Sequence, residues 1–244
     1  MKENDIEGWE MTTTDDYLCF RNDNYSIYVI RTSNIGFINY CYLLADVKNE
    51  LTILIDPSWE FNKINELLVS IGMKLTAILL THSHYDHTNL VNDFILEHKA
   101  KAYMSQQEIE WYGFRCLGLT AVEDNQLLEF GNIKIKCILT PGHTFGSMCY
   151  MTGDCLYCGD TVFIEGCGSC DFIGSDPGGM FDSLQKLKHI IMPDVRVMPG
   201  HSFGKKPGEL FGKTCRDNIY FNINERGKFI EFRMRADKKS IAFV

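Results

Sequence analysis

The first quarter of the chain alternates short apolar runs with turn residues. Between residues 16 and 56, four runs rich in β-branched and aromatic side chains are separated by Asn, Asp, Ser and Gly, and they read YLCF, YSIYVIR, FINYCYLLA and LTILID. This pattern predicts successive strands that begin with antiparallel pairing. A helix is predicted over Phe61–Ile71, where apolar residues recur at helical spacing and Gly72 follows as a stop signal.

The rest of the chain repeats the order of strands followed by helices. The continuous apolar run LTAILLT predicts a strand that is buried on both faces, and HSHYDHTNL follows it on a strand-to-helix loop before a helix near residues 90–98. Further strands are predicted at KAYMS, LLEF, NIKIKCIL, SMCYM, CLYC and VRVMP, and helices at SQQEIEWYGF, 179–191 and 209–222. The order β, α, β, α predicts two stacked sheets with helices outside them.

The composition of the chain limits the classes of protein to which it can belong. With 244 residues, 45% of them apolar, no internal repeat and no Pro/Ser-rich linker, residues 1–244 are predicted to form a single domain. The opening MKENDIEGWE lacks the features of an export signal, and no apolar run approaches the ~20 residues that span a bilayer, so a cytoplasmic protein without membrane contact is expected. The net charge of −8 and the absence of a Lys/Arg cluster argue against nucleic acid as a partner.

Three of the seven histidines lie with an aspartate in one short segment, as His82, His84, Asp86 and His87. Residues two apart on an extended segment point the same way, so His82 and His84 can converge on one ion. Asp86 and His87 lie past the bend and can offer a carboxylate and an imidazole to a second ion. These are zinc donors, and two ions ~3.5–4 Å apart can share a hydroxide.

Three further donors follow predicted strands in or beside glycine turns: His143 in LTPGHTFGS, Asp160 in LYCGDTVF and His201 in VMPGHSFG. Loops that leave strand ends are where a rigid scaffold presents reactive side chains. With the segment THSHYDH they complete the seven donors of a two-metal site. The remaining histidines, His98 and His189, lie in helical stretches and are predicted to be structural.

The motifs THSHYDH, PGHT, CGD and PGHS, in this order, resemble the metallo-β-lactamase superfamily, and more closely its glyoxalase II-like branch. The resemblance covers nearly the whole chain and implies an α/β fold, the four-layer αβ/βα sandwich. It implies two zinc ions, with iron or manganese as alternatives, and a hydroxide between the ions as nucleophile, oriented by Asp86 as the catalytic residue. It assigns one ion to His82, His84 and His143, the other to Asp86, His87 and His201, and the bridging position to Asp160.

Two segments carry a narrower resemblance. GDTVFIEGCGSCDFIGSDPGGMFDSL and NIYFNINERGKFIEFRMR are similar to the zinc-dependent hydrolases encoded beside trans-acyltransferase polyketide synthases. This resemblance implies a hydrolase in polyketide biosynthesis that cleaves a small-molecule or carrier-bound thioester, in which acyl carrier protein, coenzyme A or glutathione is the thiol. The acyl group and the oligomeric state stay open.

Two alternatives to a thioester hydrolase are considered. The same glycine-rich segment resembles the iron-containing persulfide dioxygenases, which usually read GCGRTDF, whereas this chain has Ser169 and Cys170 in place of Arg and Thr. That alternative would use His82, His143 and Asp160 around one iron ion. The other alternative is a non-catalytic metal-binding protein that docks on a synthase, although a structural zinc site needs only four ligands.

Two cysteine pairs, Cys155-x-x-Cys158 and Cys167-x-x-Cys170, can be interpreted as a zinc site, as redox pairs or as structural residues. The first pair lies in a predicted strand, where residues three apart face opposite sides and their thiols do not converge. The second pair lies in a glycine-rich loop. Structural or pocket-lining roles are therefore favoured for all four cysteines.

Overall fold

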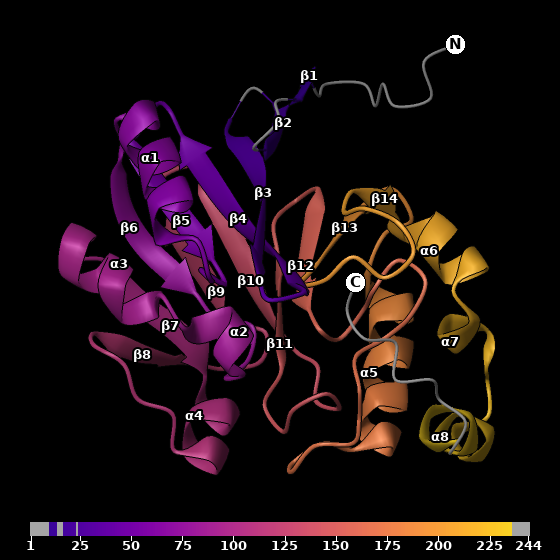
Figure 1. Ribbon diagram of the computed structural model, residues 1–244. Helices are drawn as coiled ribbons and strands as arrows, with labels where there is room; N and C mark the ends of the chain where they lie inside the picture. The colour runs from indigo at the N-terminus through magenta and orange to yellow at the C-terminus, as the bar shows by residue number, and fades with distance from the viewer. Residues whose placement is uncertain (1–9, 14–16, 23, 236–244) are drawn as a thin grey trace.

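Two β-sheets face each other in the computed structural model, which describes residues 10–13, 17–22 and 24–235 (Figure 1). Within these ranges the first sheet has eight strands in sequence order: β1 (Glu10–Thr13), β2 (Tyr17–Arg21), β3 (Ser26–Asn34), β4 (Phe37–Asp46), β5 (Leu51–Ile55), β6 (Lys74–Leu79), β7 (Lys101–Ser105) and β8 (Leu119–Val122). Strands β1 to β5 pair antiparallel, as predicted for the opening of the chain, and β5 to β8 pair parallel.

Among the described residues, the second sheet has six strands in the order β14-β13-β12-β11-β10-β9. Their bounds are β9 (Leu127–Phe130), β10 (Ile133–Leu139), β11 (Met148–Met151), β12 (Cys155–Gly159), β13 (Arg196–Pro199) and β14 (Glu209–Leu210). Pairing is antiparallel except between β12 and β13, which are parallel. The carboxyl ends of β12 and β13 therefore lie together at one edge of this sheet.

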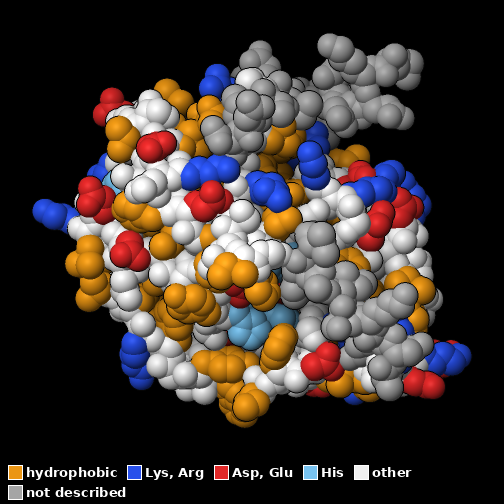
Figure 2. All heavy atoms as spheres, in the orientation of Figure 1, with side chains coloured by type: hydrophobic (Ala, Val, Ile, Leu, Met, Phe, Trp, Pro, Cys, Tyr) orange, Lys and Arg blue, Asp and Glu red, His pale blue; other side chains and the backbone are white. Residues whose placement is uncertain are grey.

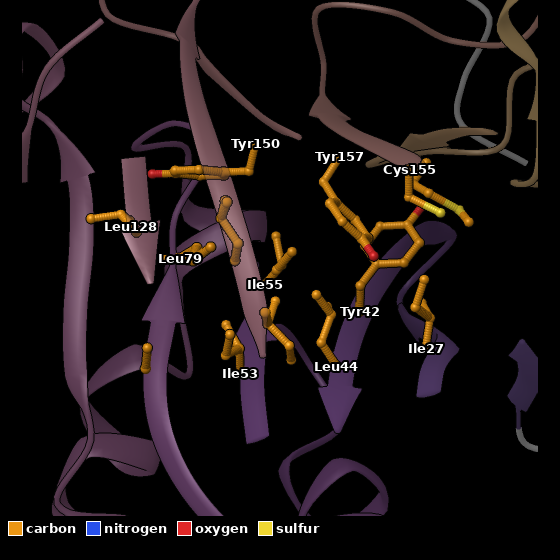
Figure 3. Packing of buried hydrophobic residues seen from close by; sticks show 14 of the residues in the cluster. Ile27, Tyr42, Leu44, Ile53, Ile55, Leu79, Leu128, Tyr150, Cys155 and Tyr157 are labelled. Carbon is orange, nitrogen blue, oxygen red and sulfur yellow. The ribbon is translucent and has the colours of Figure 1, made fainter. Parts of the chain in front are cut away.

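Large buried side chains fill the space between the sheets (Figure 3). Tyr150 and Tyr157 of the second sheet face Ile55 and Leu79 of the first, and the rings of Tyr42 and Tyr157 meet edge-on with centroids 5.2 Å apart. The phenol of Tyr150 donates to the carbonyl of Leu80 over 3.0 Å, because a buried hydroxyl needs a polar partner. This apolar layer holds the two sheets in a fixed relation.

Helices cover the outer face of each sheet (Figure 1). The helices are α1 (Phe61–Ile71), α2 (Tyr85–Thr88), α3 (Val91–His98) and α4 (Gln106–Tyr112) beside the first sheet, and α5 (Pro177–Ile190), α6 (Phe211–Asp217), α7 (Ile219–Asn222) and α8 (Arg226–Met234) beside the second. The predicted αβ/βα sandwich is therefore confirmed. Over the described ranges, no helix has the length and apolar character needed to cross a bilayer.

Most predicted elements appear within a residue or two of their predicted bounds, and the helix predicted over 209–222 is confirmed only in part. Residues 209–210 pair as β14, and the helical segment that follows is interrupted at Asn218, whose backbone is extended and whose side chain accepts a hydrogen bond from the amide of Tyr220. The chain therefore forms two short helices, α6 and α7, in place of one. The expectation of no export signal was drawn from the first ten residues, of which 1–9 lie outside the described part.

The cysteine pairs follow the strand geometry. Cys155 packs in the layer between the sheets and Cys158 packs on the helix side, so the prediction that they face opposite sides is confirmed. Cys167 and Cys170 are buried on the helix side of the second sheet. All ten cysteines are free thiols.

Candidate metal centre

The first four donors lie where β6 ends. The chain stays extended through His82 and His84, since His84 has φ −59° and ψ 144° as the residue that precedes α2. The turn into α2 then places Asp86 and His87 in its first turn, and His87 is 1% exposed. The predicted division into two donors before the bend and two after it agrees with the structure.

The other three donors come from loops of the second sheet. His143 lies between β10 and β11, Asp160 follows β12 directly, and His201 follows β13 after Gly200. A Cβ atom at Gly200 would lie 2.5 Å from Cε1 of His87 and 2.7 Å from Oδ1 of Asp160. Glycine is therefore required at this position because the backbone passes directly against two donors.

Three imidazoles form the first group of donor atoms. Nδ1 of His84 lies 3.1 Å from Nε2 of His82 and 3.0 Å from Nε2 of His143. The three nitrogens lie within 4.8 Å of one another, which is the spacing of atoms that can bind one ion. This set is the one that the family resemblance implies for the first metal.

The second group contains Asp86, His87 and His201. Nε2 of His201 lies 3.2 Å from Oδ2 of Asp86 and 3.3 Å from Nε2 of His87. His87 and Asp86 are also close, with 3.5 Å between Nε2 and Oδ2. Two nitrogens and one oxygen thus face a common point, and they again match the implied set.

Asp160 lies between the two groups. Its Oδ2 is 3.5 Å from Nε2 of His143 in the first group and 3.5 Å from Nε2 of His201 in the second. Its Oδ1 is buried without a hydrogen bond from the described residues, and Nε2 of His87 is 3.4 Å away. A buried carboxylate oxygen in this position is costly unless it binds a cation, so the residues present fit the expected metal ions.

Burial and charge shift the pKa values of the donors in different directions. Burial, together with the neighbouring histidines, holds the pKa of His82 well below its usual value, and burial lowers the pKa of His143 to about 4. The carboxyl groups of Asp86 and Asp160 have pKa values far below the ordinary range because the adjacent imidazoles His87 and His201 outweigh the effect of burial. The same carboxylates outweigh burial in the opposite direction for their partners, and they raise the pKa of His87 well above its usual value and the pKa of His201 above its usual value. An ion bound by the second group would therefore displace protons from these two rings, because neutral imidazoles and ionised carboxylates are the forms that bind metals.

The nitrogens that face away from the centre are held by acceptors. Nδ1 of His143 donates to the carbonyl of Ser169 and Nδ1 of His201 donates to the carbonyl of Ile38, each over 2.7 Å. Because a carbonyl oxygen only accepts, both rings carry a proton on Nδ1 and turn Nε2 towards the centre. These bonds fix the orientation of each ring.

Asp56 was not among the residues selected from the sequence. Its Oδ2 lies 3.0 Å from Nδ1 of His87, and its carboxylate also accepts bonds from the amide and the hydroxyl of Thr81, over 2.8 and 2.6 Å. Its position in the sequence could have indicated this role. Asp56 directly follows β5, which pairs parallel with β6, and the carboxyl ends of parallel neighbours lie at the same edge of a sheet, so Asp56 lies beside the donor loop that follows β6. A second omission is Asn39, whose Nδ2 donates to Oδ2 of Asp86 over 3.1 Å.

The remaining histidines and the cysteines lie apart from the centre. Nε2 of His98 is 2.7 Å from Oδ1 of Asn65, and Nδ1 of His189 donates to the carbonyl of Gln185 over 2.6 Å. Over the residues that the structure describes, the groupings suited to a metal ion contain only members of the seven. No cysteine group of that kind is found among the described residues, which favours the structural interpretation of the cysteine pairs.

Comparison with known proteins gives relatives along most of the chain. A Bacillus subtilis protein named "Probable polyketide biosynthesis zinc-dependent hydrolase PksB" is 46% identical over 220 residues, which is 90% of this chain and 98% of that protein. The cytoplasmic isozyme of hydroxyacylglutathione hydrolase from Saccharomyces cerevisiae is 38% identical over 178 residues, covering 69% of this chain and 65% of the relative.

A solved structure shows the same architecture at lower identity. The crystal structure of ETHE1 from Myxococcus xanthus superposes with a TM-score of 0.77 at 23% identity, over 86% of this chain and 91% of that one. The defining pattern of the Metallo-beta-lactamase superfamily matches residues 35–201, the span that contains all seven donors. With this match and the two relatives, the chain belongs to the Metallo-beta-lactamase superfamily.

Proposed function

We propose that this protein is a zinc-dependent hydrolase that cleaves a thioester in polyketide biosynthesis, with two zinc ions held by the seven convergent residues. The observation that carries the proposal is the position of Asp160, whose Oδ2 lies 3.5 Å from a histidine of each donor group. One carboxylate shared by two groups is the arrangement expected of a paired-ion centre. The names of the Bacillus subtilis and yeast relatives support zinc dependence and an acyl-thiol substrate.

The hydrogen bonds indicate which part of the reaction each residue supports. When bound, the two ions would polarise the thioester carbonyl and lower the pKa of water towards ~7, which supplies hydroxide at neutral pH. Asn39 holds the Asp86 carboxylate by donating to Oδ2 and to its backbone carbonyl, over 3.1 and 2.9 Å. Asp86 is thereby fixed in an orientation that directs the attacking water, which is the role proposed for it.

A thiol leaving group reduces what the rest of the site must do. Thiols have pKa values near 8.5, so a thiolate departs without prior protonation, whereas an amide nitrogen would need a general acid. A thioester therefore needs no general acid beyond the metal centre, which is consistent with the substrate class proposed here.

The decisive experiment combines metal analysis with a substrate panel. The purified protein is expected to contain about two zinc ions per chain and to hydrolyse at least one thioester among acyl carrier protein, coenzyme A and glutathione conjugates. His82→Ala should abolish turnover while the circular dichroism spectrum is retained, because one nitrogen of the first group is lost. His98→Ala is the matched control, because His98 lies outside the centre.

Three outcomes would contradict the proposal. Unchanged turnover in purified His82→Ala would remove the assigned site. One iron ion per chain with oxygen uptake on a persulfide would identify a dioxygenase. No hydrolysis across the panel, together with tight binding to a synthase, would identify a non-catalytic partner.

A further inference from the structure

Aromatic rings, most of them exposed, lie beside the metal centre. Figure 2 shows a group of imidazole atoms (pale blue) in the middle of the face turned to the viewer, with hydrophobic side chains (orange) beside it. Five rings that are linked to the donors by ring contacts or by neighbouring positions in the chain are called here the aromatic mouth: Trp59, which is half-buried, and Tyr85, Trp111, Phe145 and Phe172, which are exposed. Exposed rings are costly on a surface unless something covers them, so their concentration at this place needs an explanation.

Phe172 forms the side of the mouth that touches the first donor group. Its ring centroid lies 5.2 Å from that of His84 and 6.0 Å from that of His143, and both contacts are edge-on. The residue nevertheless leaves 55% of its surface exposed. One face of this ring is therefore free to contact a molecule whose reacting atom sits at the centre.

Trp111 and Phe145 extend the same side outward. Their rings stack with centroids 4.3 Å apart, and they are 54% and 41% exposed. The hydroxyl of Tyr112 donates to the carbonyl of Ile173 over 2.9 Å, which ties α4 to the loop that carries Phe172. These contacts hold this part of the mouth in place.

The second part of the mouth consists of Tyr85 and Trp59. Tyr85 is 74% exposed, lies directly between His84 and Asp86 in the chain, and meets the Trp59 ring edge-on with centroids 5.9 Å apart. Trp59 is fixed because its indole nitrogen donates to Oδ1 of Asn39 over 2.7 Å. Both parts of the mouth are therefore anchored to residues of the metal centre.

We infer that the aromatic mouth binds the apolar acyl chain of the thioester, so that the protein prefers medium-length hydrocarbon acyl groups. The inference rests on the proposed function, because it assumes that a thioester carbonyl sits at the centre. The five rings carry no formal charge and mainly offer apolar faces. The amide-rich arm of coenzyme A or of a carrier protein, and the charged glutathione, need polar partners that these faces do not supply.

The test is a chain-length series on one thiol. Acetyl, butanoyl, hexanoyl and octanoyl thioesters of N-acetylcysteamine should show kcat/KM rising by about two- to fourfold per added CH2, because each buried methylene contributes about 0.8 kcal/mol at most. Phe172→Ala should flatten this slope, so that kcat/KM falls by a larger factor for the octanoyl ester than for the acetyl ester. Leu96→Ala is the matched control, since Leu96 is 69% exposed on α3 away from the mouth.

A second measurement needs no turnover. In metal-free protein, octanoyl-N-acetylcysteamine should shift the tryptophan fluorescence of Trp59 and Trp111 at lower concentration than the acetyl compound does. The same difference should persist in Leu96→Ala and shrink in Phe172→Ala. This binding signal reports on the mouth independently of the ions.

The outcomes separate this inference from the proposed function. Absence of hydrolysis for every thioester sinks the proposed function, whatever the mouth binds. Hydrolysis with a flat chain-length dependence in the unaltered protein, or a slope that survives Phe172→Ala, overturns the inference alone. If Phe172→Ala changes only the discrimination between thiols at a fixed acyl group, the mouth holds the thiol arm and the inference is wrong.

Discussion

Glu108 is predicted to hold the loops that carry the first donor group. Its side chain is fully buried on α4, where Oε1 accepts bonds from the amide and the hydroxyl of Ser83 over 2.8 and 2.7 Å. Its Oε2 accepts from the amide of Gly146 over 2.8 Å. Ser83 separates His82 from His84, and Gly146 follows His143 by three residues. One carboxylate therefore connects both loops.

The cost of changing this residue can be worked out bond by bond. In Glu108→Gln the amide oxygen can still serve Ser83, but the amide nitrogen then faces the N–H of Gly146 and leaves it unpaired. A buried unpaired donor costs ~1–3 kcal/mol. For a chain of this size, that corresponds to a fall in Tm of about 2–12 °C. Glu108→Ala removes all three bonds and should cost at least ~3 kcal/mol.

The assay compares unfolding with metal affinity. Thermal unfolding of metal-free protein gives the stability loss, and competition with a chelator gives the affinity of each zinc ion. Glu108→Gln should weaken one of the two ions selectively, because the loops that it connects supply only the first group. Glu110→Gln is the control, since Glu110 is exposed on the same helix and pairs only with Gln106 among its described contacts. Equal affinity of both ions in Glu108→Gln and the unaltered protein would refute the positioning role.

Three further predictions concern other parts of the fold. Asp56→Asn should lower zinc affinity about 10–100-fold in a chelator competition, because His87 loses its carboxylate partner; unchanged affinity would show that the ring is held by other contacts. Treatment with a chelator should abolish hydrolysis and lower Tm, and added zinc should restore both, because only the folded chain assembles the donors; full activity in rigorously metal-free protein contradicts this. Burial acts to raise the pKa of Asp46, but hydrogen bonds from Asn132 and Asn49 outweigh burial and lower it. The ionised carboxylate therefore stabilises the fold at pH values above its ordinary pKa of ~3.9, and this contribution is lost as the pH falls below that value. The stability difference between the unaltered protein and Asp46→Asn, measured by denaturant unfolding, should therefore shrink between pH 6 and pH 3, and a difference that is constant with pH would contradict the assignment.

The architecture was largely predictable from periodicity. The helix over Phe61–Ile71 and the strand Lys101–Ser105 were predicted with their observed bounds, since each is a short amphipathic or apolar segment between turn residues. Strand β8 (Leu119–Val122) was missed because two of its four residues are exposed and its apolar pattern is weak. The helix α8 was missed because its charged and apolar residues are mixed around its circumference.

The candidate site was predictable only as far as its residue types are unusual. Histidines crowded beside an aspartate or next to Pro-Gly turns stand out in the sequence, and the structure brings all seven together. Asp56 and Glu108 do not stand out, because aspartate and glutamate are common and their importance depends on which loops they meet in space. The metal assignment itself and the single-domain organisation stay predictions.

The way the loops cross between the sheets also bears on how the molecule responds to losing its ions. The amide of Met148 donates to the carbonyl of Thr81 over 2.9 Å, and the amide of Tyr40 donates to the carbonyl of Gly200 over 2.8 Å. Both bonds join one half of the chain to the other beside the donor residues. Ions bound there would act as crosslinks that oppose sliding of one layer past the other. Amide hydrogen exchange at these two positions would then report directly on metal occupancy, faster in the apo protein and slower in the loaded one.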